Sequence, residues 1–368
     1  MEEINIDKML RLRNIDRREF LKFCGQMAAV LGLSQAYIPK IASAIEKASK
    51  RPSVVWLHFA ECTGDSEAFL RTVYPSIGEL VLDVLSIDYH ETIMAAAGTQ
   101  AEENLHKTIK DEKGKYICIV EGAIPTKDNG IYLTIAGKTG LEIAKEVCGN
   151  AFATICVGNC ACYGGVQAQY PNPTGAKGVT DAIGIKTVNI PACPHNPKNS
   201  VATVVNYLLF GKLPDVDKYG RPLFAFYERI HDHCPRRAHF DAGQFVEQFG
   251  SEEAKKEYCL YKMGCKGPET YNNCSKVLYN DMSWPIAAGH GCVGCSEPNF
   301  WDSMQPFYER LPGVKIPGGG GVETTVDNVG FAMAGAAAAG IAAHAVYTLT
   351  KKTGSAVLPE EGKKEGGE

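Results

Sequence analysis

Residues 152–165 read FATICVGNCACYGG, a β-prone apolar run followed directly by a loop rich in glycine and cysteine. The same arrangement occurs twice more. The apolar run 53–59 precedes Cys62, and residues 186–190 precede Cys193. The carboxyl ends of parallel strands meet at one edge of a sheet, where ligands bind. We therefore expect Cys62, Cys160 and Cys193 to lie near one another at such an edge.

Further segments extend this pattern on both sides. Residues 80–87 and 115–121 are also strand-like, whereas 139–148 and 199–209 have helical patterns. Strands that alternate with helices indicate an α/β fold with a parallel sheet. We predict a flavodoxin-like domain over residues 51–211, with its ligands in the loops that follow the strands.

Composition narrows the class of protein. The chain has 368 residues, 45% of them hydrophobic, and a net charge of −4, which is typical of a globular protein of about two domains. Its charges are dispersed, so the sequence predicts no nucleic-acid surface. Most of the 14 cysteines fall between residues 156 and 295, in short groups beside Gly and Pro. In a chain of this length, such grouping indicates metal or iron–sulfur ligation rather than disulfides.

The segment 212–316 has little periodicity and many Gly, Pro, His, Cys and aromatic residues. We expect few regular elements there, and bound cofactors that organise it. Its potential ligands form two groups. One has an imidazole and three thiols, and the other has three thiols with a proline between them: His231, Cys234, Cys259 and Cys265; then Cys274, Pro285, Cys292 and Cys295.

The N-terminal segment has the pattern of an export signal. Arg17 and Arg18 precede an apolar run, and Ala42-Ser43-Ala44 offers small residues for cleavage. This predicts a twin-arginine signal peptide over residues 1–44, a type that exports folded proteins, so we leave it out of the expected fold. An amphipathic helix with two adjacent arginines is the alternative.

The C-terminal segment predicts a membrane anchor. Residues 329–350 form an apolar run that spans roughly 33 Å as a helix, enough to cross a bilayer. Lys351 and Lys352 follow, which predicts a cytoplasmic tail over 351–368 and the body of the protein on the other side. The glycine-rich stretch 317–328 is expected to be a linker. A buried Ala-rich helix is the alternative.

Taken together, the cysteine motifs resemble those of nickel–iron hydrogenase small subunits over essentially the whole chain. The most specific match is GHGCVGCSEPNFWD at residues 289–302. The other matching motifs, in chain order, are Glu61-Cys62-Thr63-Gly64, Gly158-x-Cys160-x3-Gly164-Gly165, Cys193-Pro194, His231-x2-Cys234 and Cys259-x5-Cys265-Lys266-Gly267-Pro268.

The resemblance implies three clusters. A proximal 4Fe-4S cluster would be held by Cys62, Cys160 and Cys193 with a fourth ligand. A distal 4Fe-4S cluster would be held by His231, Cys234, Cys259 and Cys265. A medial 3Fe-4S cluster would be held by Cys274, Cys292 and Cys295, with a proline where a fourth cysteine would stand.

The family also implies a function and partners. The nickel–iron site would lie in a partner large subunit, in a heterodimer or a higher assembly. This chain would conduct electrons from H2 oxidation to a membrane cytochrome b or a quinone-linked subunit, on the periplasmic side of the membrane. An iron–sulfur electron-transfer module without hydrogenase activity is the alternative function. The 289–302 motif counts against it.

One position departs from the family pattern. Its first loop normally reads Cys-x-x-Cys, whereas this chain has Asp65 at the second cysteine. Either Asp65 is itself an oxygen ligand of the proximal cluster, or Cys162 supplies the missing thiolate. We favour Asp65, because the loop already delivers that position to the iron. His195 is either a donor to a ligand or a surface residue, and Cys118, Cys148 and Cys156 are expected to be buried structural cysteines.

Overall fold

The computed structural model describes residues 17–47, 52–71, 86–310, 314–315, 323–324 and 326–353. The chain divides into two compact units, residues 1–310 and residues 311–368. Each unit is described by itself.

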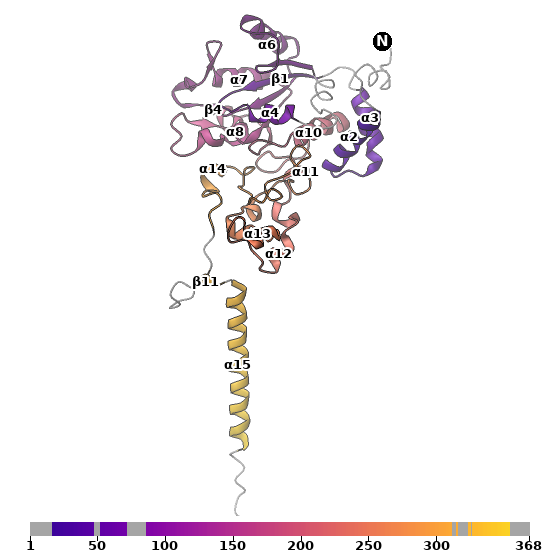
Figure 1. Cartoon of the computed structure of the whole chain (residues 1–368). Helices are drawn as coiled ribbons and strands as arrows, with labels where there is room; N and C mark the ends of the chain where they lie inside the picture. The colour runs from indigo at the N-terminus through magenta and orange to yellow at the C-terminus, as the bar shows by residue number, and fades with distance from the viewer. Residues whose placement is uncertain are drawn as a thin grey trace, which may run out of the picture. The chain divides into compact units, whose positions relative to one another are not determined.

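A parallel five-stranded sheet forms the centre of the first unit (Figure 1). Its strands lie in the order β2-β1-β3-β7-β9, which is the 2-1-3-4-5 order of flavodoxin-like folds. Their bounds are β1 Ser53–His58, β2 Ser86–His90, β3 Ile117–Glu121, β7 Ala153–Val157 and β9 Val188–Ile190. The predicted parallel α/β domain is thus confirmed. Residues 80–85 of the predicted second strand lie outside the described residues.

The strands form because nearly continuous apolar runs are buried on both faces of the sheet. Alternate residues along β1 point to opposite sides. Val54 and Trp56 belong to one apolar cluster, and Val55 and Leu57 belong to the other.

Helices cover both faces of the sheet. α10 (Pro197–Phe210) packs on the Trp56 side, while α6 (Thr99–Asp111) and α7 (Gly140–Asn150) pack on the Leu57 side. α7 begins with a capping box in which Thr139 and Glu142 each bond the other's backbone N–H. α10 begins with the Asn196 cap and ends at Gly211, whose positive φ suits a helix terminus.

The N-terminal segment packs on the body of the first unit. α2 (Arg17–Val30) and α3 (Ile38–Lys47) both contact α10. Phe23 and Met27 are buried in the same cluster as α10. Their spacing gives the helix an apolar face, and a matching apolar face on α10 receives it.

Residues 212–310 confirm the expected irregular architecture. They contain only short elements in the described chain: α11 Leu223–Phe226, α12 Arg237–Asp241, α13 Glu252–Lys255, α14 Phe300–Ser303 and the 3-10 turns η4 Ile230–His233, η5 Tyr261–Met263 and η6 Gly267–Glu269. An apolar cluster that includes Ile230, Val246 and Trp284 lies among them.

The second unit contains α15 (Val326–Thr353), which is drawn in yellow in Figure 1. Residues Val329–Lys351 of this helix are long and apolar enough to cross a membrane, as the sequence predicts. The helix begins at Val326, inside the segment expected to be a linker. β10 (Val314–Lys315) and β11 (Glu323–Thr324) pair antiparallel before it.

Candidate iron–sulfur ligand sites

Three cysteines lie in loops at the carboxyl edge of the sheet. Cys62 follows β1, Cys160 lies in α8 (Gly158–Tyr163) directly after β7, and Cys193 follows β9. The thiols are close enough to affect one another. Burial raises the pKa of Cys160 and of Cys193 to about 12, and Asp65 and Cys62 add to both shifts. The structure therefore brings the three predicted proximal ligands together.

Asp65 lies at the same edge, in the first turn of α4 (Gly64–Leu70), and is only 7% exposed. His195 holds its carboxylate, because the His195 backbone N lies 2.6 Å and its Nδ1 2.8 Å from Asp65 Oδ1. His195 is fully buried, so it is not a surface residue. Gly158 has φ +78°, and a Cβ there would lie 1.9 Å from Asp65 Oδ2. Only glycine allows this approach.

The N-terminus of α4 is held by a buried carboxylate that the sequence analysis missed. Glu121, at the end of β3, accepts hydrogen bonds from Asp65 N at 2.9 Å, Ser66 N at 3.0 Å and Ser66 Oγ at 2.5 Å. Burial raises the pKa of Glu121, and the Ser66 hydroxyl opposes that shift. An acidic residue at the end of an otherwise apolar strand could have indicated this role from the sequence.

The Cys162 thiol packs in the apolar cluster beside the sheet. Its Sγ lies 3.5 Å from the carbonyl oxygen of Cys156, and it belongs to the apolar cluster on the α7 side of the sheet. Cys118, Cys148 and Cys156 are buried in that same cluster, as expected. Cys118 Sγ and Cys148 Sγ are 3.6 Å apart.

The His231 group lies around η4 and the loops that follow it. The His231 ring packs edge-on against Phe240, with ring centroids 4.6 Å apart. Partial burial, followed by the nearby Arg237 charge, lowers the pKa of His231. Burial raises the pKa of Cys234, Cys259 and Cys265, to about 11 for Cys259.

The candidate medial ligands line a cavity. A space of about 350 Å³ is bordered by Cys274, Cys292, Cys295 and Pro285. Cys193 borders the same cavity, so the third group adjoins the sheet edge. Burial raises the pKa of all three thiols, to about 12 for Cys274. A cavity lined by three thiols fits a metal cluster, whose binding would displace the thiol protons.

The loops that carry Cys265 and Cys292 are joined by hydrogen bonds from backbone N–H groups. Cys292 N donates a hydrogen bond to Cys265 Sγ at 3.2 Å, and Lys266 N donates to Cys292 O at 2.7 Å. Gly291 permits this contact, since a Cβ there would lie 2.9 Å from the Cα of Cys265. The two loops therefore pack directly on each other.

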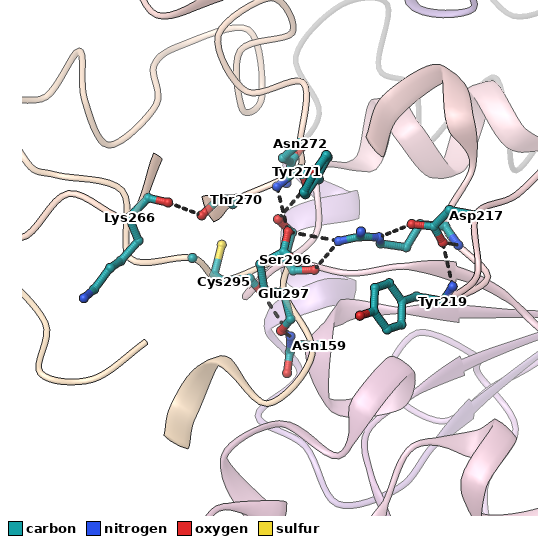
Figure 2. Close-up of polar contacts among 12 residues, drawn as sticks. Asn159, Asp217, Tyr219, Lys266, Thr270, Tyr271, Asn272, Cys295, Ser296 and Glu297 are labelled. Atoms are coloured by element: carbon teal, nitrogen blue, oxygen red, sulfur yellow. Dashed lines mark hydrogen bonds and ion pairs between the residues drawn. The ribbon is translucent and has the colours of Figure 1, made fainter. Parts of the chain in front are cut away.

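A buried polar network joins the Asp217–Arg221 segment to the loop that carries Cys295 and Glu297 (Figure 2). The Arg221 side chain, 3% exposed, donates from Nε to Asp217 Oδ2 at 2.7 Å and from a terminal nitrogen to Glu297 Oε1 at 3.0 Å. Tyr271 N donates to the same Glu297 oxygen at 2.6 Å. Sequence reasoning missed this network, because Arg221 and Glu297 lie 76 residues apart and share no motif.

Comparisons with known proteins place the chain in a family. A family model for the C-terminal part of the NiFe/NiFeSe hydrogenase small subunit matches residues 226–308. A second, "NADH ubiquinone oxidoreductase, 20 Kd subunit", matches residues 62–207. The chain is 49% identical to the quinone-reactive Ni/Fe-hydrogenase small chain of Wolinella succinogenes, over 94% of this chain and 99% of that one.

Two further matches are informative. The periplasmic [NiFe] hydrogenase small subunit of Solidesulfovibrio fructosivorans is 53% identical, over 83% of this chain and 96% of its own length. A solved structure of the reduced, active Ni-Fe-Se hydrogenase from Desulfomicrobium baculatum superposes with a TM-score of 0.66 at 35% identity, covering 71% of this chain and 100% of that one.

Proposed function

The chain belongs to the small subunits of nickel–iron hydrogenases, and from this premise we propose that its three groups of side chains hold three iron–sulfur clusters. As a hydrogenase small subunit it transfers electrons, while the active-site metals lie in a separate large subunit. Iron–sulfur clusters, when bound, take up and release single electrons at potentials that their ligands set.

The cavity lined by Cys274, Cys292 and Cys295 is the observation that carries the proposal. It offers three thiols and a proline, which suits a medial 3Fe-4S cluster. Cys193 on its border adjoins the proximal group, and the backbone bond from Cys292 to Cys265 adjoins the distal group. This order supports electron transfer from proximal to medial to distal.

For the proximal 4Fe-4S cluster we propose Cys62, Asp65, Cys160 and Cys193 as ligands. Asp65 is favoured over Cys162 because its carboxylate lies at the ligand edge, whereas the Cys162 thiol faces the apolar cluster. For the distal 4Fe-4S cluster the ligands are His231, Cys234, Cys259 and Cys265. The half-exposed His231 is the exit toward an electron acceptor.

Purification of the complex through a tag on this chain tests the function. We expect a nickel-containing large subunit to co-purify, with iron bound to this chain and hydrogen-dependent dye reduction. The reason is that this chain conducts electrons, whereas the partner large subunit oxidises hydrogen. Iron without nickel, in an intact complex that reduces no dye with hydrogen, would contradict the proposal and favour an electron-transfer module without hydrogenase activity.

The location follows from the two ends of the chain. Export by the twin-arginine route and anchoring by α15 would place the body on the periplasmic side, with residues 351–368 in the cytoplasm. The name of the Wolinella succinogenes relative, quinone-reactive, supports a quinone-linked acceptor such as a membrane cytochrome b. Docking of α2 and α3 on α10 is compatible with export in the folded state.

Removing residues 326–368 is expected to release the hydrogenase from membranes, because no other described helix is long and apolar enough to span one. Dye-linked hydrogen oxidation should persist in the soluble fraction, while quinone-linked oxidation should be lost. Ala337→Leu, which keeps the helix apolar, is the matched control and should stay membrane-bound. A truncated protein that still sediments with membranes would refute the anchor.

A further inference from the structure

Asn159 touches the three loops that carry Cys160, Cys193 and Cys295. It precedes Cys160 at the start of α8 and is 2% exposed. Its backbone N donates to the carbonyl of Ala192, the residue before Cys193, at 2.8 Å. Its side-chain Nδ2 donates to the carbonyl of Cys295 at 3.0 Å and to that of Glu297 at 3.1 Å (Figure 2).

We propose that Asn159 is a positioning residue that fixes the separation and orientation of the proximal and medial clusters. The inference rests on the cluster assignment proposed above. The Asn159 side chain is not a ligand. It acts through the peptide groups that carry Cys160 and Cys295, one from each cluster.

The side-chain amide suits this task chemically. One amide nitrogen carries two N–H donors, and here they serve two carbonyls on the opposite loop. An apolar side chain of the same size would leave the buried Glu297 carbonyl and the partly buried Cys295 carbonyl without this donor, a loss that protein interiors tolerate poorly. The contact is also long-range, since 136 residues separate Asn159 from Cys295.

The loop of Cys295 and Glu297, to which Asn159 donates, has further contacts of its own. Glu297 is fixed by Arg221 and by Tyr271 N. Ser296 Oγ donates to Tyr271 O at 2.9 Å, as Figure 2 shows. Asn159 therefore joins the proximal loops to a medial loop that has hydrogen bonds and an ion pair of its own.

Replacing Asn159 should change electron transfer between the clusters and not the amount of iron bound. Each cluster keeps all its ligands when Asn159 is replaced, so iron binding should persist. Transfer between two redox centres weakens steeply as they separate or reorient. A looser contact between the loops should therefore slow transfer and weaken the magnetic coupling between the two clusters.

Asn159→Leu in the complete hydrogenase tests the inference. We expect an unchanged iron content, with a several-fold weaker splitting and relaxation enhancement between the reduced proximal and medial clusters in EPR spectra. Freeze-quench EPR after mixing with hydrogen should show slower reduction of the medial cluster. Asn159→Ser, which is smaller and keeps one donor, should give an intermediate coupling and serves if the leucine variant fails to fold.

Asn189→Leu is the matched control. Asn189 is also a buried asparagine, and its Nδ2 donates to Tyr219 O at 2.8 Å without touching a ligand loop. Its replacement should lower the thermal midpoint and leave the coupling unchanged. Unchanged coupling in Asn159→Leu with both clusters present, or an equal loss in Asn189→Leu, would overturn the inference alone. Absence of proximal and medial signals from the unmodified hydrogenase would overturn the cluster assignment as well.

Discussion

Asp65→Cys is expected to retain a proximal cluster with a changed midpoint potential and changed EPR and Mössbauer spectra. A carboxylate oxygen is a harder ligand than a thiolate, and ligand type sets cluster potential. The substitution also removes the carboxylate that His195 holds with two contacts. Asp65→Ala should lower hydrogen-dependent dye reduction by at least about 10–100-fold, the range typical of losing even an outer partner of a metal site.

Cys162→Ala is the control for that experiment. The Cys162 thiol lies against the Cys156 carbonyl, on the apolar side of the sheet, so its removal should leave the cluster spectra unchanged. Spectra that respond to Cys162→Ala but not to Asp65→Cys would assign the fourth proximal ligand to Cys162 and refute the aspartate.

Arg221→Met is expected to destabilise the fold by about 3–5 kcal/mol, the range for breaking a buried ion pair from one side. The Glu297 carboxylate would then stay buried without its guanidinium partner, and Asp217 would lose the same partner. Thermal unfolding of the purified hydrogenase, followed by circular dichroism, measures the effect as a lower midpoint.

Arg229→Met gives the comparison for the buried pair. Arg229 pairs with Asp232 at 3.1 Å, but both side chains are exposed to solvent. Exposed pairs of this kind contribute about 0–1 kcal/mol, so the midpoint should hardly move. Equal shifts of the unfolding midpoint in the two variants would show that the Arg221 network stabilises the fold no more than an exposed ion pair does.

The sheet was predictable because local sequence carries most of its determinants. The runs at β1, β3, β7 and β9 are apolar almost without interruption, as buried parallel strands require, and each strand ends within a residue of its predicted end. The cysteines that follow β1, β7 and β9 could be placed at one edge from strand order alone. β2 was only partly covered by its prediction, which ran from residue 80 to 87.

The packing of the N-terminal helices could not be predicted from local sequence, for a physical reason. An apolar run after two arginines looks the same whether it enters an export channel or packs on a protein surface. Phe20, Phe23 and Met27 pack against the α10 side of the sheet, which only the tertiary structure makes visible. An export signal and a docked helix are therefore compatible descriptions of one segment.

Contacts between distant segments account for what the sequence could not supply. His195 meets Asp65 across 130 residues, and Glu121 meets Ser66 across 55. No periodicity or spacing rule predicts such pairs, because they depend on which loops the sheet brings together. The candidate ligand residues could be named from sequence, because metal chemistry restricts ligands to a few residue types in short motifs.

The backbone bonds between the Cys265 and Cys292 loops bear on how the protein matures. A loop that binds metal becomes ordered as it binds, and each of these loops supplies part of the frame for the other. On the proposed ligand assignment, filling either site would therefore order part of its neighbour. Under iron limitation, empty and fully loaded chains should then outnumber half-loaded ones.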